Sequence, residues 1–193
     1  LSDMMWRDCY KVSSIERYPL AWDKRDIDTA LDSWYVHDFG VPWNHHRWEL
    51  TLHPAGHIPG AAMLHIKTPE TTVLLTGDFD TRDSSLVRGA QPVKADILFV
   101  EGTYGGRDHP PKEEEIDRFT SAVEEVVKRG GTVLIPAFAN GRTQDVVMML
   151  HKHLPHLNVH VDGMGKRVAK THLNHPPLLR DGGALERAWR WAK

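Results

Sequence analysis

The segment from His53 to Asp78 constrains the fold most, because it sets a histidine and an aspartate just beyond strand-like runs. His57 lies in a turn flanked by glycines, and Asp78 follows an apolar run that closes with Thr-Gly. Small residues beside such side chains let the backbone turn sharply and let a metal ion and its substrate approach. Imidazole nitrogen and carboxylate oxygen are donors that hydrolytic metal centres use. The segment therefore predicts a metal site at strand ends, with His57 and Asp78 following neighbouring strands.

Composition narrows the class of protein. The chain has 193 residues, of which 40% are hydrophobic, enough for one large domain or two small ones. The net charge of −2 excludes a global basic surface, so any contact with nucleic acid must be local. The single cysteine, Cys9, excludes an internal disulfide and a cysteine-rich zinc site. No apolar run approaches about 18 residues, so we expect a cytoplasmic protein with no membrane partner.

One helix and several short strands are expected in the first half of the chain. Asp23 is a typical N-cap for an amphipathic helix that runs to about Trp34. Strand composition occurs in the segments 48–52, 62–66 and 72–75. The apolar run 97–100 ends at Glu101, which indicates a buried strand that delivers a carboxylate to a sheet edge.

The second half of the chain alternates between helical and strand patterns. Apolar residues at helical spacing follow Pro110-Pro111 and stop at Gly130-Gly131, and a second helix should end at about Leu150. The segments 132–137 and 159–161 read as short strands, and a third helical stretch follows Gly165. This βαβα order predicts a parallel sheet with helices on its faces. The change of pattern places a domain boundary near residue 107.

Five motifs in a fixed order resemble those of a known family. They are AGHIPGAAM (55–63), LLTGDF (74–79), VEGTYGG (100–106), IPAFANGRTQD (135–145) and VHVDGMG (159–165). Together they resemble the β-CASP metallo-β-lactamase nucleases, and most closely the RNA-cleaving branch that includes the cleavage and polyadenylation endonuclease, its archaeal relatives and RNase J. The resemblance covers about residues 45 to 175. It implies an α/β protein with part of a metallo-β-lactamase αββα domain (1–107) followed by the first part of a β-CASP α/β domain (108–193).

The resemblance assigns roles to three side chains. His57 would ligate one zinc ion, and Asp78 would bridge the two zinc ions of the intact centre. Glu101 matches the first β-CASP motif, whose carboxylate holds a distant histidine that protonates the leaving oxygen. These roles fit the hydrolysis of a phosphodiester, in which a bridged hydroxide attacks and a general acid completes the step.

Two parts of the family pattern are absent. The HxHxDH motif, which supplies the other zinc ligands, should precede His57, and the last two β-CASP histidine motifs are expected beyond Lys193. We therefore expect a fragment of a longer protein that is inactive by itself. The run from His151 to His156 imitates HxHxDH but follows His57 and ends a helix, so we expect it to be solvated.

Two interpretations of Gly141-Arg142 stay open. The pair opens a helix after an apolar segment, where free backbone N–H groups could receive a phosphate of RNA. Alternatively, it makes a tight turn in which Arg142 pairs with a nearby acid. Lys166, Arg167 and Lys170 lie at helical spacing and read as a solvated face, with RNA contact as the alternative.

The function expected from these residues is that of a zinc-dependent ribonuclease in RNA 3′-end processing or decay. Its partners would be single-stranded RNA and either a second copy or the other subunits of a processing complex. One alternative is a DNA nuclease of the Artemis and cross-link-repair branch, which tends to carry aspartate where this chain has Glu101. Another is a non-catalytic subunit that binds RNA or acts as a scaffold. The sequence leaves endonuclease and exonuclease action both open.

Overall fold

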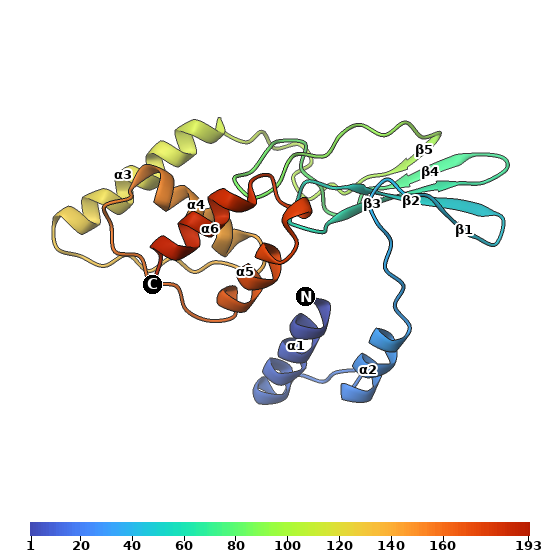
Figure 1. The fold of residues 1–193 in the computed structure, drawn as a ribbon, viewed down its shortest axis with the longest axis horizontal. Helices are drawn as coiled ribbons and strands as arrows, with labels where there is room; N and C mark the ends of the chain where they lie inside the picture. The colour runs from blue at the N-terminus through green and yellow to red at the C-terminus, as the bar shows by residue number, and fades with distance from the viewer. The chain divides into compact units, whose positions relative to one another are not determined.

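The computed structural model describes all 193 residues and divides into two compact units, Leu1–Asp38 and Phe39–Lys193 (Figure 1). The first unit contains helices α1 (Ser2–Glu16) and α2 (Lys24–Asp32). The second contains strands β1 (Trp43–His45), β2 (Trp48–Pro54), β3 (Ala62–Lys67), β4 (Thr72–Leu75) and β5 (Ile97–Phe99). It continues with helices α3 (Lys112–Lys128), α4 (Arg142–His153), α5 (Gly165–Leu173), the short 3₁₀ helix η1 (Pro176–Leu178) and α6 (Gly182–Trp191). The predicted mixed α/β class is confirmed.

The first unit is a pair of helices whose ends follow local sequence rules. Asp23 caps α2 as predicted: its carboxylate accepts from the N–H groups of Arg25 and Asp26, and the Asp26 side chain accepts from the Asp23 N–H. This reciprocal capping satisfies N–H groups that a helix start otherwise leaves unpaired. Arg7 of α1 reaches Asp28 of α2 at 2.6 Å and so links the two helices.

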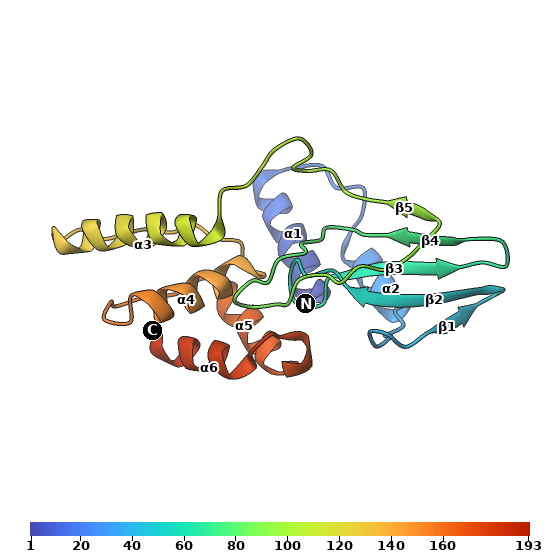
Figure 2. The ribbon, with the colours of Figure 1, turned by 90° about the horizontal axis from the view of Figure 1, so that it is seen from above.

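The second unit is built on a five-stranded sheet in the order β1-β2-β3-β4-β5 (Figure 2). Neighbouring strands are antiparallel except β4 and β5, which are parallel. Because β3 runs opposite to both β2 and β4, the strands β2, β4 and β5 all run in one direction. Their carboxyl ends therefore meet at one end of the sheet, and that end carries the candidate site.

The two faces of this sheet differ in burial. On one face Met63 and Leu74 are buried against Ala55 and Ala90. The opposite face is apolar at every alternate position of the central strands, and none of its residues is buried. It consists of Leu50, Leu52, Leu64, Ile66, Val73, Leu75, Ile97 and Phe99. We call this set the open apolar face.

Strand β5 departs from its predicted burial. The run 97–100 was expected to be a buried strand, yet Ile97, Leu98, Phe99 and Val100 are all about half exposed. The reason is its position, because β5 is the last strand of the sheet and pairs only with β4. Parallel strands are normally covered on both faces, and no element of the second unit covers β5 in this way.

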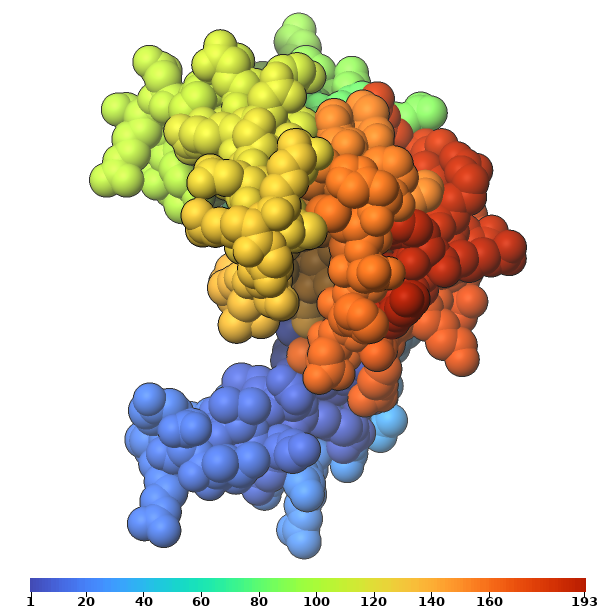
Figure 3. All heavy atoms as spheres, turned by 90° about the vertical axis from the view of Figure 1, so that its left-hand side faces the viewer, coloured from blue at the N-terminus to red at the C-terminus, as the bar shows by residue number.

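Helices α3, α4 and α6 lie side by side, with α4 in the middle (Figure 3). One apolar cluster joins Val147 and Met148 of α4 to Leu185 of α6. Leu86 and Val87, from the loop after β4, insert into the same cluster. The helices and the sheet are thus parts of one compact unit. The domain boundary near residue 107 lies within that unit and stays a prediction about the intact protein.

The two strands predicted for the second half are absent. Val133 and Ile135 pack against the α3–α4 cluster while Leu134 is 92% exposed, so residues 132–137 alternate like a strand. No segment hydrogen-bonds to them, and a strand needs a ladder partner to form. Residues 159–161 pair only with Lys193, through two hydrogen bonds of 2.9 Å. The predicted parallel sheet is therefore wrong for this chain.

The three helices predicted for the second half are confirmed as α3, α4 and α5, and α6 was not anticipated. α6 places Trp189 and Trp191 against the apolar clusters, and the Trp191 indole N–H donates to the Pro155 carbonyl at 2.9 Å. Both tryptophans thus have a packing role. None of the helices combines the length and the apolar character that a membrane span requires.

Candidate functional site

A cavity of about 920 Å³ opens at the carboxyl ends of β2, β4 and β5. His57, Asp78 and Glu101 all line it, although they come from three separate loops. His57 follows β2, Asp78 follows β4 and Glu101 follows β5. The parallel register pairs Leu75 with Phe99, so Asp78 and Glu101 follow adjacent strands, with their positions one residue apart in register. The sequence thus predicted the grouping, but His57 and Asp78 do not follow neighbouring strands, because β3 lies between β2 and β4.

The His57 loop is fixed by backbone contacts with the loop that follows Asp78. The N–H of Asp80 donates to the carbonyl of Ala55 at 3.0 Å, and Ala55 is fully buried. Gly56 has φ +72°, and a Cβ at this position would lie 2.3 Å from the Asp80 carbonyl oxygen. Only glycine, which has no Cβ, allows the two backbone segments to lie this close together. The close contact holds the histidine-bearing loop and the aspartate-bearing loop together.

Glu101 is held in its charged form by local hydrogen bonds. The Thr103 N–H donates to its Oε2 at 2.9 Å, and the Glu101 N–H donates to Thr76 Oγ1 at 3.3 Å. Hydrogen bonds from Thr103 lower the pKa of the Glu101 carboxyl, and the Phe79 backbone and the charge of His57 act in the same direction. A carboxylate with these partners stays ionised and can hold a cationic group.

Metal binding is the chemistry that His57 and Asp78 best suit, but the chain supplies only part of a centre. The structure contains no group of three or more His, Cys, Asp or Glu side chains that could hold a metal ion. Tight hydrolytic zinc sites use at least three protein ligands. His57 and Asp78 therefore have the right donor chemistry for part of a centre, and the residues present do not complete one.

The other histidines singled out in the sequence lie away from the cavity. His53 is on β2, where its ring centroid lies 6.0 Å from that of His65. His151 contacts Trp191, and His156 lies 3.9 Å from Glu124 of α3. His153 and His156 are exposed and His151 is half-buried, which agrees with the solvated role expected for most of this run.

Several charged residues of the cavity were not identified from the sequence. Burial raises the pKa of the Asp80 carboxyl, but the side-chain and backbone hydrogen bonds from Arg82 together with the charges of Arg82 and Lys112 outweigh burial, and the net shift is downward. Burial raises the pKa of the Asp145 carboxyl, and the nearby charges of Arg142 and Lys112 only partly oppose it. Asp145 lies within the motif 135–145, so its place directly after Gly-Arg-Thr-Gln was the signal that could have found it.

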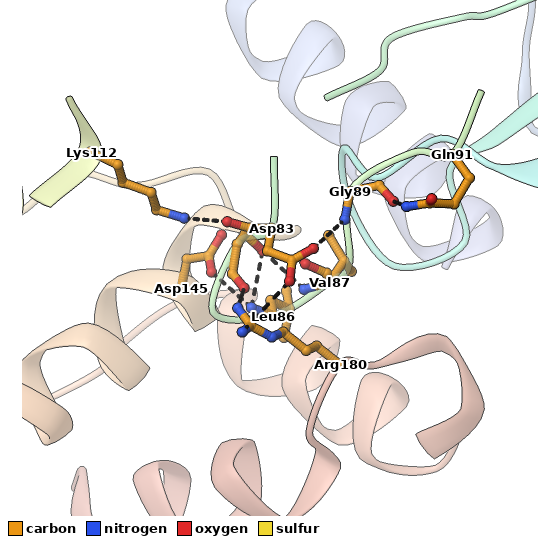
Figure 4. Close-up of polar contacts among 9 residues, drawn as sticks. Asp83, Leu86, Val87, Gly89, Gln91, Lys112, Asp145 and Arg180 are labelled. Carbon is orange, nitrogen blue, oxygen red and sulfur yellow. Dashed lines mark hydrogen bonds and ion pairs between the residues drawn. The ribbon is translucent and has the colours of Figure 1, made fainter. Parts of the chain in front are cut away.

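The cavity wall is a loop that ties the sheet to the helices (Figure 4). Asp83 is its centre: its carbonyl accepts from Lys112 Nζ at 2.6 Å, and its carboxylate accepts from the Gly89 N–H and lies 3.6 Å from Arg180. Asp145 joins the same network, because its Oδ1 accepts from the Leu86 N–H at 3.1 Å. Lys112 at the start of α3, Asp145 of α4 and Arg180 before α6 thus all bind this loop, which gives the cavity a fixed wall.

Arg142 lines the cavity and is exposed, whereas Gly141 is buried. The Gly141 N–H donates to the Gln144 side chain at 2.8 Å, so this donor is already used within the turn. Arg142 lies close enough to oppose the rise in the Asp145 pKa. The structure therefore agrees with both interpretations of Arg142: it has an acidic neighbour with which it could pair, and it lines the cavity where a phosphate could bind. Lys166, Arg167 and Lys170 are exposed on α5 and outside the cavity, as expected for a solvated face.

Comparison with known proteins finds relatives that are named as ribonucleases or as a cleavage and polyadenylation factor, although no family model matches the chain. It is 39% identical over 178 residues to the cleavage and polyadenylation specificity factor subunit 3 of Dictyostelium discoideum, over 91% of this chain and 21% of that protein. It is 29% identical over 198 residues to the probable RNase MJ4 of Methanocaldococcus jannaschii, over 100% of this chain and 46% of that protein. The endoribonuclease ysh1 of Schizosaccharomyces pombe is 29% identical over 157 residues, or 80% of this chain and 20% of that protein.

The chain belongs to the β-CASP metallo-β-lactamase family. It spans between about a fifth and a half of the length of these relatives. The family resemblance drawn from the five motifs is thereby confirmed. The roles of His57, Asp78 and Glu101 remain predictions about the intact β-CASP protein.

Proposed function

We propose that the intact protein to which this chain belongs is a zinc-dependent ribonuclease that hydrolyses RNA phosphodiester bonds in 3′-end processing or decay. The observation that carries the proposal is the convergence of His57, Asp78 and Glu101 on one cavity at a single sheet edge. The names of the relatives, which include a cleavage and polyadenylation factor and an endoribonuclease, support the choice of RNA processing.

In this proposal each side chain has a separate task. His57 and Asp78 would hold zinc together with ligands that lie outside this chain. Zinc, when bound, supplies the Lewis acid that activates water and neutralises charge on the phosphate. Glu101 orients the group that donates a proton to the leaving oxygen, and its lowered pKa keeps it ionised for that task. Arg142, exposed in the same cavity, contacts a phosphate of the substrate.

Because this chain holds only two of the metal ligands, we propose that the 193 residues alone bind zinc weakly and cleave nothing. Single-stranded RNA is the proposed substrate, and the other subunits of a processing complex are the proposed protein partners. The near-neutral charge of the chain predicts modest electrostatic affinity, so discrimination between RNA and DNA would depend on shape, stacking and 2′-hydroxyl contacts.

The test uses the intact protein and a pair of single-stranded oligonucleotides, one RNA and one DNA, of the same sequence. Cleavage of each is measured across a series of salt concentrations for the wild type, for Asp78→Asn and for Asp117→Asn. Asp117 is an exposed aspartate of α3 outside the cavity and serves as the matched control. We expect cleavage of RNA that survives moderate salt, is abolished in Asp78→Asn and is unchanged in Asp117→Asn.

Other outcomes would assign a different function. Preferential cleavage of DNA would favour a nuclease of the DNA-repair branch. RNA binding without any cleavage by the intact wild type would favour a non-catalytic scaffold. Equal activity of wild type and Asp78→Asn would refute the role given to the cavity.

A further inference from the structure

Two buried polar side chains bind the turn from Ala139 to Arg142, whose last residue lines the cavity. Gln144 has no exposed surface, and its amide makes three hydrogen bonds. Its Oε1 accepts from the Gly141 N–H at 2.8 Å, and its Nε2 donates to the Ala139 carbonyl at 3.0 Å and to the Gly165 carbonyl at 3.1 Å. One side chain therefore binds the turn at two points and ties it to the start of α5.

His172 of α5 is the second of these side chains and is 3% exposed. Its Nε2 lies 3.1 Å from Asn140 Oδ1, while its Nδ1 is buried without a partner. Burial lowers the pKa of His172 to about 4, so the ring is neutral at physiological pH. A neutral imidazole carries one N–H, and a bond to the Asn140 oxygen requires this proton to be on Nε2. His172 thus donates to the turn, and the buried Nδ1 keeps a free lone pair.

The turn also touches the loop that bears His57. Gly141 has φ 85° and ψ −64°, and a Cβ at this position would lie 2.5 Å from Ile58 Cγ2. Ile58 is the residue after His57, and Arg142 is the residue after Gly141. The turn therefore contacts the residue next to the predicted metal ligand, and its last residue, Arg142, lines the cavity.

Apolar side chains would fill this interior at a lower cost of burial, since every buried polar atom must find a partner. Gln144 and His172 instead direct their hydrogen bonds to three consecutive residues, Ala139 to Gly141. Because these hydrogen bonds join the turn to side chains of α4 and α5, they hold the turn in one arrangement. The benefit of this network therefore concerns the conformation of the turn rather than simple packing.

We propose that Gln144 and His172 are positioning residues that fix the turn from Ala139 to Arg142 and thereby set where the Arg142 guanidinium lies beside the His57 loop. The proposal rests on the proposed function, because it assigns Arg142 to a phosphate of RNA. Neither residue touches the substrate; both act through Arg142. If the turn relaxes, the charged hydrogen bond from Arg142 to phosphate is lost, which corresponds to about 10- to 100-fold weaker binding.

The binding experiment measures the Kd of the intact protein for a 2′-O-methyl oligoribonucleotide by fluorescence anisotropy. Gln144→Met and His172→Phe should bind about 10- to 100-fold more weakly, as should Arg142→Ala. The double variant Gln144→Met with Arg142→Ala should bind no more weakly than Arg142→Ala alone, because both changes remove the same contact. His172→Gln, which keeps a donor for Asn140, should restore the binding that His172→Phe loses.

A structural control separates positioning from general loss of stability. Leu185 is fully buried in α6 and belongs to the helical core rather than to the turn. Leu185→Ala should lower the melting temperature and leave the Kd of the folded protein unchanged. Additive effects of the Gln144 and Arg142 changes, or an equal loss of binding in Leu185→Ala, would overturn the proposal.

Hydrogen–deuterium exchange of residues 138–145 provides a readout that does not depend on RNA. Exchange should be faster in Gln144→Met and His172→Phe than in the wild type, and it should be unchanged in His172→Gln and Arg142→Ala. Unchanged exchange in the first two variants overturns the proposal, whatever the RNA does. If the variants show the expected exchange but the wild-type protein binds no RNA, the proposed function and the role of Arg142 are refuted, whereas the role of Gln144 and His172 in fixing the turn is not.

Discussion

Replacing Gly56 with alanine should damage this protein far more than the same change at Gly60, although both glycines lie in the His57 loop. Both have a positive φ, +72° at Gly56 and +87° at Gly60, so an added Cβ strains the backbone at either position. That strain costs roughly 1–2 kcal/mol per residue. Their surroundings differ, because nothing lies within 4 Å of the Cβ built at Gly60.

At Gly56 the Cβ would lie 2.3 Å from the Asp80 carbonyl oxygen and 2.5 Å from the Ala90 nitrogen. Both are backbone atoms, so relief requires the two loops to separate. Overpacking of this kind costs typically about 1–3 kcal/mol in addition to the strain. We therefore expect Gly56→Ala to lose roughly 2–5 kcal/mol and Gly60→Ala only about 1–2 kcal/mol, against a typical total of about 5–15 kcal/mol.

The assay is urea unfolding of the 193-residue chain, followed by tryptophan fluorescence, with the free energy of unfolding compared at equal m-values. Equal losses for Gly56→Ala and Gly60→Ala would refute the argument, since they would mean that the close contact between the two site loops contributes nothing. A smaller loss for Gly56→Ala would refute it more strongly.

Three further predictions address the site, its pH dependence and the sheet. In the intact protein, Asp78→Ala should lower the cleavage rate more than Glu101→Ala, and the loss in Glu101→Ala should not exceed about 10²–10⁴-fold. The measurement is single-turnover cleavage at saturating zinc, and a larger loss in Glu101→Ala than in Asp78→Ala would contradict these roles. Burial lowers the pKa of His172 from 6.5 to about 4, so the stabilising contribution of its neutral ring is complete above pH 6.5 and is lost as the pH falls toward 4. The free energy of unfolding from urea melts should therefore fall over this pH range in the wild type and not in His172→Gln. The same pH dependence in both proteins would contradict this prediction. The isolated chain should bind the dye ANS through its open apolar face, and Leu64→Lys, on that face, should reduce the ANS fluorescence without unfolding the protein. Met63→Lys, on the buried face, should instead unfold the sheet. Unfolding by Leu64→Lys would show that the open apolar face is in fact covered.

Features that depend on neighbouring residues in the chain were predictable from the sequence. The N-cap at Asp23 and the end of α3 at Gly130 follow from local chemistry. The strands β2, β3 and β4 follow from composition and turn residues. The grouping of Asp78 and Glu101 follows from parallel strands that end at one sheet edge.

Features that depend on distant partners were not predictable. Residues 132–137 have the alternation of a strand, but whether they form one depends on a neighbour that this chain does not provide. The run 97–100 is as apolar as a buried strand, and its exposure reflects its place at the sheet edge. Asp145, Gln144 and His172 contact residues 21 to 59 positions away, and although the motif 135–145 contains two of them, the sequence does not say which partners they meet.

The central claim is that His57 and Asp78 are metal ligands in the intact protein, and the most direct test is to count zinc. Elemental analysis of the purified intact protein should give fewer zinc ions per chain in His57→Ala than in the wild type. His53→Ala, which removes a histidine four residues earlier on β2 and outside the cavity, should keep the wild-type content. Unchanged zinc in His57→Ala, or equal loss in His53→Ala, would contradict the account.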